Sequence, residues 1–140
     1  MNFREFFLGS SEFKSAEEIV KLVGEYPSIL PGESLTDAET LLIFQTSQQQ
    51  TWLVAAAKGL YCVLDDLNKS FTRVCWVIPL DKLIGADNKI VGLATHDKTE
   101  KTGLLDIGDR RNWLFSKMLF TQEDIKTKIT QLITHRLMAS

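Results

Sequence analysis

The fold is decided by the stretch GLLDIGDRRNWLFS, residues 103–116. Two apolar runs, 103–107 and 112–116, lie on either side of a tight turn at 108–111, and this pattern predicts a pair of strands. An amphipathic segment at 121–137 then predicts a single helix at the end of the sequence. Strands first and one packing helix last indicate an α+β domain.

Five further strands are predicted before this pair, at 41–45, 51–57, 60–64, 71–78 and 90–95. Short turns separate most of them and no helical pattern lies between them, so we expect an antiparallel meander rather than βαβ units. The runs 60–64 and 74–78 are hydrophobic at nearly every position. Strands of this kind need cover on both faces of their sheet.

A predicted N-terminal helix is the natural cover for the outer face of the sheet. Ser15 and Glu18 have the spacing of a capping box, and Pro27 marks the end of the helix. Its apolar face is formed by Ile19, Leu22, Val23 and Tyr26.

The C-terminal helix is predicted to follow Thr121 as its N-cap, with Asp124 as the partner in a second capping box. His135 and Arg136 lie in its final turn, where the helix dipole favours positive charge. Its apolar stripe consists of Ile125, Ile129, Leu132, Ile133 and Leu137.

The composition is that of an ordinary globular protein, with 44% hydrophobic and 24% charged residues in a chain of 140. We expect one folded unit, with residues 1–38 as an aromatic segment and covering helix and residues 39–140 as the main domain. The net charge of −2 gives no whole-protein field that would attract nucleic acid or an anionic membrane. No apolar run resembles a membrane span or a signal sequence, and the two cysteines fit a reducing compartment, so we expect a cytoplasmic protein.

Four phenylalanines, Phe3, Phe6, Phe7 and Phe13, lie within the first 14 residues. Disordered tails are poor in aromatic residues, so we expect this segment to dock. Its own domain and the surface of a partner are the two sites considered.

Three apolar stretches and the helix after them carry a resemblance to the pleckstrin-homology-like superfold, in particular to bacterial pleckstrin-homology-like and GRAM-like domains. The stretches are LLIF at 41–44, LYCVL at 60–64 and WLFS at 113–116. The resemblance implies a seven-stranded antiparallel bent barrel plugged by the C-terminal helix, and a role in binding lipid head groups, peptides or proteins. The loop at 47–50 carries no charge, which argues against phosphoinositide binding at the customary face of such domains.

The sequence predicts no catalytic, cofactor-binding or metal-binding site. His96 and His135 lack the paired spacing of metal ligands, and we expect both to lie on the surface. Two acidic pairs, at 65–66 and at 106 and 109, fall at predicted turns, where Asp forms local hydrogen bonds. A catalytic or calcium-binding carboxylate pair is the alternative interpretation.

Cys62 and Cys75 are predicted to face each other across a hairpin centred on residues 67–70, with Leu64 opposite Arg73. Buried cysteine behaves as a small hydrophobic residue, and no basic cluster near either thiol would lower its pKa. A structural role is therefore expected, with a redox switch as the alternative.

The candidate partner-binding residues are Arg110, Arg111 and Trp113. Arginine beside an exposed aromatic residue is common in recognition surfaces. A solvated hairpin turn, in which Asp109 offsets one of the charges, is the other interpretation.

The leading hypothesis for function is a non-enzymatic interaction module that binds a protein or peptide through an exposed strand edge or an apolar groove beside a helix. A small-ligand-binding protein or an enzyme with a cavity in the curved sheet is the first alternative, and a deep apolar pocket with convergent polar groups would favour it. Peripheral membrane attachment through the Phe-rich N-terminus is the second. Open strand edges also fit a homodimer.

Overall fold

The computed structural model describes residues 12–138. Most of the aromatic N-terminal segment, residues 1–11, lies outside this range, so its expected docking is not tested by the fold. None of the helices in the described part of the chain combines the length and the apolar character that crossing a bilayer requires.

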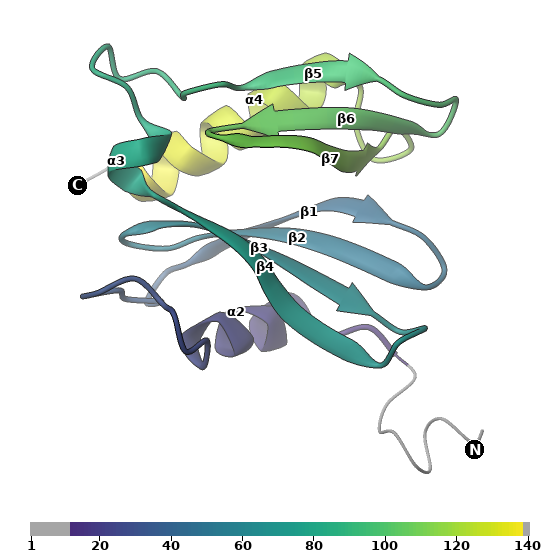
Figure 1. The fold of residues 1–140 in the computed structure, drawn as a ribbon, viewed down its shortest axis with the longest axis horizontal. Helices are drawn as coiled ribbons and strands as arrows, with labels where there is room; N and C mark the ends of the chain where they lie inside the picture. Colours follow the sequence, from purple (N-terminus) through teal and green to yellow (C-terminus); the bar gives the residue numbers. More distant parts are fainter. Residues whose placement is uncertain (1–11, 139–140) are drawn as a thin grey trace.

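In the described part of the chain, seven antiparallel strands form two sheets, and helices lie before, between and after them (Figure 1). The first sheet has the order β1-β2-β3-β4, with β1 Glu39–Gln45, β2 Gln49–Ala55, β3 Gly59–Asp66 and β4 Phe71–Pro79. The second has the order β5-β6-β7, with β5 Ala94–Asp97, β6 Thr102–Ile107 and β7 Arg110–Ser116. The helices are α2 Ala16–Gly24, α3 Leu80–Leu83 and α4 Gln122–Ile133, which continues into a π-helical turn, η1 Thr134–Met138.

The first sheet is covered on both faces, as its doubly apolar strands require (Figure 1). On one face it packs against α2 in a small core that contains Ile19, Val23, Tyr61 and Val63. On the other face it packs against the second sheet and α4 in the main core, which includes the fully buried Leu53, Leu105 and Phe115. These side chains occupy the space between the two sheets.

Both helix starts are confirmed at the level of individual hydrogen bonds. Ser15 and Glu18 form the predicted capping box of α2, and Thr121 and Asp124 form that of α4. The predicted apolar stripe of the C-terminal helix is buried throughout, from Ile125 in α4 to Leu137 in η1. The α+β class, the seven antiparallel strands and the C-terminal helix are therefore confirmed.

The predicted fifth strand at 90–95 is wrong in its position. The chain leaves β4 through α3, which was not predicted, and a single bridge between Ile84 and Ile90 then closes a separate loop. β5 begins only at Ala94 and extends to Asp97. The cause lies just before β5, where Gly92 has a φ of +66° and a Cβ on it would lie 2.5 Å from the carbonyl oxygen of Gly108.

The expectation of a barrel requires a correction, because the two sheets are not closed into one. β1 and β7 contact each other at one corner, where the Ser116 hydroxyl accepts a hydrogen bond from the Gln45 amide at 2.9 Å. This link runs through a side chain and not through a backbone ladder. At the other corner, α3 and the loop after it take the place of any pairing between β4 and β5.

The pairing of β3 with β4 corrects the prediction for the two cysteines. Leu64 faces Arg73 as expected, but Cys62 faces Trp76. A β-bulge between these pairs leaves Cys75 as an extra residue on β4 without a direct partner on β3.

Candidate functional site

A surface groove of about 310 Å³ lies between the end of α2 and the start of β4. Its position follows from the end of the helix, since Tyr26 still donates its amide hydrogen bond to Val23 and the next residue, Pro27, has no amide hydrogen to donate. The chain turns there, so that Tyr26 and Pro27 form one wall. The groove is lined by Leu22, Glu25, Tyr26, Pro27, Thr72, Arg73 and Val74.

The floor of the groove belongs to the small core. Leu22 and Val74 are half-buried and pack against that core, one from α2 and one from β4. Apolar contact area is therefore already arranged at the base of the groove, with polar side chains around it. Recognition sites commonly combine an apolar base with a few polar groups in this way.

The open edge of β4 runs beside this groove. Among residues 12–138, β4 pairs only with β3, so its outer backbone N–H and C=O groups have no neighbouring strand. Residues 71–74 keep a regular register with β3, and the bulge at Cys75 interrupts the edge only beyond them. The bulge limits uncontrolled pairing along the rest of the edge.

One charge of each sign borders the groove. The guanidinium of Arg73 lies over the ring of Phe71, at 5.1 Å from its centroid, and Glu25 is exposed at the end of α2. A cation above an aromatic face at an exposed site gains roughly 0.5–1 kcal/mol, which favours one orientation of the arginine. The groove thus offers an apolar base, one cation, one carboxylate and an unpaired strand edge.

The start of β4 is held by the buried carboxylate of Asp65. One of its oxygens accepts a hydrogen bond of 3.0 Å from the Thr72 hydroxyl, and the other accepts one of 2.8 Å from the Lys14 amide. Asp65 is only 2% exposed. It therefore fixes the segment before α2 and the first residues of β4 relative to each other.

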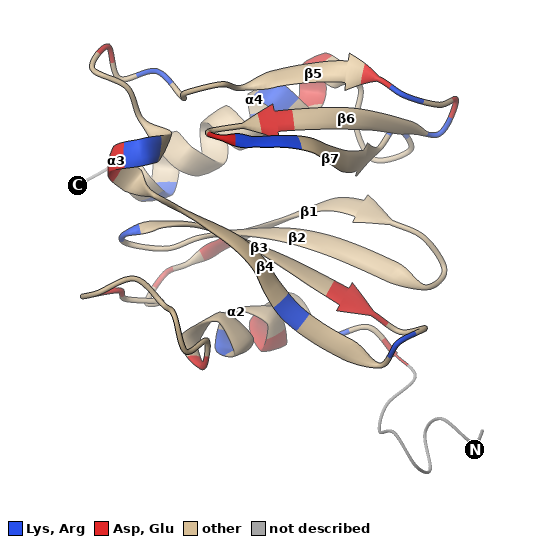
Figure 2. Ribbon diagram, in the orientation of Figure 1, with Lys and Arg blue, Asp and Glu red and all other residues tan. Residues whose placement is uncertain are grey.

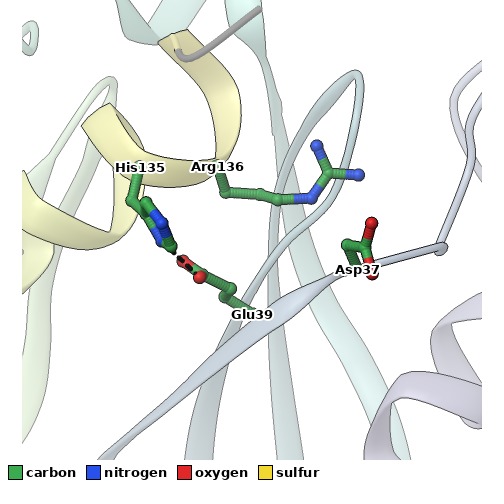
Figure 3. A pocket seen from close by; sticks show the side chains of 4 residues that line it. All are labelled: Asp37, Glu39, His135 and Arg136. Carbon is green, nitrogen blue, oxygen red and sulfur yellow. Dashed lines mark hydrogen bonds and ion pairs between the residues drawn. The ribbon is translucent and has the colours of Figure 1, made fainter.

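A second hollow, of about 510 Å³, lies where η1 meets the start of β1 (Figure 3). His135 contacts the carboxylate of Glu39 through its Nδ1 atom, and Arg136 donates a 2.8 Å hydrogen bond to the Thr36 carbonyl. The Nε atom of Arg136 is buried and has no hydrogen-bond partner among residues 12–138. Together with Asp37, these residues make a polar hollow of mixed charge that joins the C-terminal helix to the first strand.

The three predicted partner-binding residues differ in their exposure. Arg110 and Arg111 are exposed, whereas Trp113 packs against the main core, with its ring 5.6 Å from that of Trp76 at an interplanar angle of 62°. A bulge in β7 lies between them, where Asn112 has a φ of +64° and the register to β6 shifts between Leu105 and Ile107. The extra residue separates the arginines from the tryptophan.

His96 and Asp106 form a polar pair on the second sheet, with 3.0 Å between His96 Nε2 and an Asp106 carboxylate oxygen. The other oxygen accepts a hydrogen bond of 2.9 Å from the Asn112 amide, and Nη1 of Arg111 lies 4.0 Å from the oxygen that contacts His96. The hydrogen bond from the Asn112 amide is the largest cause of the lowered pKa of Asp106, and His96 lowers this pKa further. The carboxylate therefore secures the β7 bulge, as a local hydrogen-bonding role predicts.

The two thiols are poor nucleophiles in the folded chain. Burial raises the pKa of Cys62, which has no exposed surface, and the nearby Cys75 raises it further. Burial also raises the pKa of Cys75, an effect that Arg73 partly opposes. Both cysteines are free thiols in the structure.

Within residues 12–138, no group of three or more His, Cys, Asp and Glu side chains is placed to hold a metal ion. Figure 2 shows Lys and Arg interspersed with Asp and Glu over the helices, strands and turns, and β2 carries no charge.

Sequence reasoning missed the groove because its walls come from two distant segments, around residues 22–27 and 72–74. The one available signal was Tyr26, at the last position of the apolar stripe of the predicted helix and directly before Pro27. A helix that ends on an aromatic residue and a proline leaves that side chain at a surface corner.

Comparison with protein-family models gives no match to this chain, and neither curated proteins nor solved structures match it.

Proposed function

We propose that this protein is a non-enzymatic interaction module that binds an extended segment of a partner protein along the edge of β4. The observation that carries the proposal is the coincidence of two features at residues 71–74, an unpaired strand edge and an apolar groove beside α2. Addition of a peptide strand to an exposed edge gains backbone hydrogen bonds, and adjacent pockets then select side chains.

The charges of the groove define the class of partner. An extended segment on the edge of β4 would place alternate side chains toward Leu22 and Val74, so apolar residues at every second position are favoured. Arg73 and Glu25 favour an acidic and a basic residue in the same segment. The filled space between the two sheets supports this proposal over a ligand cavity in the interior.

The fold is also proposed to be a variant of the pleckstrin-homology-like superfold. The support is the succession of a four-stranded sheet, a three-stranded sheet and a packed C-terminal helix. A cytoplasmic location is proposed as well, on the basis of the two free thiols.

The proposal is tested by selection from a display library of random extended peptides, followed by calorimetry and amide NMR with the full chain. We expect selected peptides to shift the amide signals of residues 71–74 and to share alternate apolar positions. Arg73→Glu should weaken their binding about tenfold, the loss of one favourable charge contact.

The matched control is Arg110→Glu, which makes the same charge reversal at the predicted partner-binding hairpin. It should bind the selected peptides as tightly as the natural chain does. If Arg110→Glu abolishes binding and Arg73→Glu does not, the hairpin of β6 and β7 is the interface and the β4 edge is not. If the chain self-associates and this association shifts the amide signals of residues 71–74, the partner is a second copy of the chain.

A further inference from the structure

The groove between α2 and β4 has a candidate occupant within the chain itself. Residues 1–11 contain three of the eight phenylalanines, Phe3, Phe6 and Phe7, followed by Leu8. The described chain starts at residue 12, and Phe13 is already half-buried on the domain. The question is whether the preceding residues can reach the groove and match its chemistry.

The groove is within reach because of where the described chain begins. The Lys14 amide donates to Asp65 at 2.8 Å, and the same carboxylate accepts from the hydroxyl of Thr72, which lines the groove. Two hydrogen bonds therefore connect residue 14 to the groove wall. Residues 3–12 can span up to roughly 30 Å when extended, so no rearrangement of the domain is needed for Phe3 to arrive there.

The chemistry of the segment matches that of the groove in both apolar and charged groups. Leu22, Tyr26 and Val74 offer apolar surface to phenylalanine rings, which gain more from burial than most side chains. The segment also carries Arg4 and Glu5, one charge of each sign, next to these rings. Their charges are opposite to those of Glu25 and Arg73, which border the groove.

We propose that residues 3–8 occupy the groove between α2 and β4 and compete there with the partner segment. This inference rests on the proposed function for its regulatory meaning, although docking of the segment can be observed without any partner. A domain whose binding site is mostly filled by its own chain shows a weaker apparent affinity, reduced by the fraction of molecules in which the site is open. Displacement of the segment is then a step in partner binding.

The test uses full-length chains and methyl NMR. In the triple variant Phe3→Ala, Phe6→Ala and Phe7→Ala, the methyl signals of Leu22 and Val74 should shift because the ring currents are removed. The methyl signals of Ile129, buried in the main core, should remain in place. The control variant Ser10→Ala and Ser11→Ala alters the same segment without removing a ring and should leave all of these signals unchanged.

A second measurement addresses the competition. The triple Phe variant should bind a groove-selected peptide about tenfold more tightly than the natural chain. Unchanged Leu22 and Val74 methyl signals in the triple Phe variant would overturn the inference. If these signals are unchanged and only the natural chain binds phosphatidylcholine–phosphatidylserine vesicles, the phenylalanine rings bind a membrane and not the groove. Failure of every peptide to bind either chain would overturn the proposed function alone, because the NMR comparison contains no peptide.

Discussion

The hydroxyl of Tyr61 donates a 2.6 Å hydrogen bond to the carboxylate of Glu33. Tyr61 lies on β3 in the centre of the first sheet, and Glu33 lies in the connection between α2 and β1. The hydroxyl also accepts a hydrogen bond from the Leu30 amide, and the other oxygen of Glu33 accepts one of 2.9 Å from the Lys58 amide. One buried tyrosine thus holds the connection that positions α2 on the sheet.

Tyr61→Phe should lower the free energy of unfolding by about 1–3 kcal/mol, because the Leu30 amide and the Glu33 carboxylate each lose a partner. Chemical denaturation monitored by circular dichroism measures this change. Tyr26→Phe is the matched control, since it removes a hydroxyl from a half-buried tyrosine at the surface groove. Equal losses in the two variants would contradict the role given to the buried hydroxyl.

The burial of Tyr61 also predicts that the free energy of unfolding depends on pH in the alkaline range. Burial, followed by the hydrogen bond to Glu33, raises the pKa of Tyr61. The folded chain keeps the proton where the unfolded chain loses it, so this contribution is complete below the unfolded pKa of about 10 and declines as the pH rises beyond it. The difference in stability between the natural chain and Tyr61→Phe should therefore shrink above that pH. A constant difference would refute the assignment.

Asp106 makes the opposite prediction on the acid side. Its lowered pKa means that the carboxylate stabilises the fold above the unfolded pKa of about 3.9 and that this contribution is lost as the pH falls through the folded value. Asp106→Asn should show a flatter loss of stability with acid than the natural chain. Asp109→Asn, which removes a carboxylate at an exposed turn position, is the matched control.

Sequence patterns succeeded where the cause of a structure is local. The capping boxes at Ser15 and Thr121 depend on residues three positions apart, and the buried stripe of α4 depends on helical spacing alone. Both could be predicted without knowledge of any other part of the chain.

Prediction failed where a bulge or a loop depends on distant contacts. The bulge beside Cys75 and the one at Asn112 each insert a residue that no alternation pattern reveals. Asn112 is held by Asp106 on the neighbouring strand, and the late start of β5 depends on how closely Gly92 approaches Gly108. The groove was missed for the same reason, since it exists only once α2 has been placed beside β4.

Alkylation tests the difference in accessibility between the two cysteines. Both thiols have a raised pKa, so we expect iodoacetamide to react with each more slowly at neutral pH than with a cysteine in a free peptide. Cys75 is half-buried and Cys62 has no exposed surface, so Cys75 should react first and Cys62 only on unfolding. Mass spectrometry of the natural chain and of Cys75→Ser distinguishes the sites. Early labelling of Cys62 would show that β3 opens in the native state.

Gly103 is the position at which the addition of a single methyl group should do most damage to the second sheet. It pairs with Phe115 across β6 and β7, and a Cβ at this position would lie 2.3 Å from Cζ and 2.4 Å from Cε1 of the phenylalanine ring. The ring therefore covers the glycine backbone, an arrangement known to compensate for a missing side chain in a strand. Gly103→Ala should lower the free energy of unfolding by about 1–3 kcal/mol through overpacking.

The same clash predicts that the effects of two substitutions will not add. Phe115→Leu creates space in the main core and is destabilising alone, but it removes the atoms that an alanine at position 103 would meet. The double variant should be more stable than the sum of the two single losses by about 1–2 kcal/mol. Thermal and denaturant unfolding of the four chains gives this coupling. Simple additivity would mean that the phenylalanine ring does not lie over Gly103 in solution, and it would place the cost of Gly103→Ala in the backbone of β6.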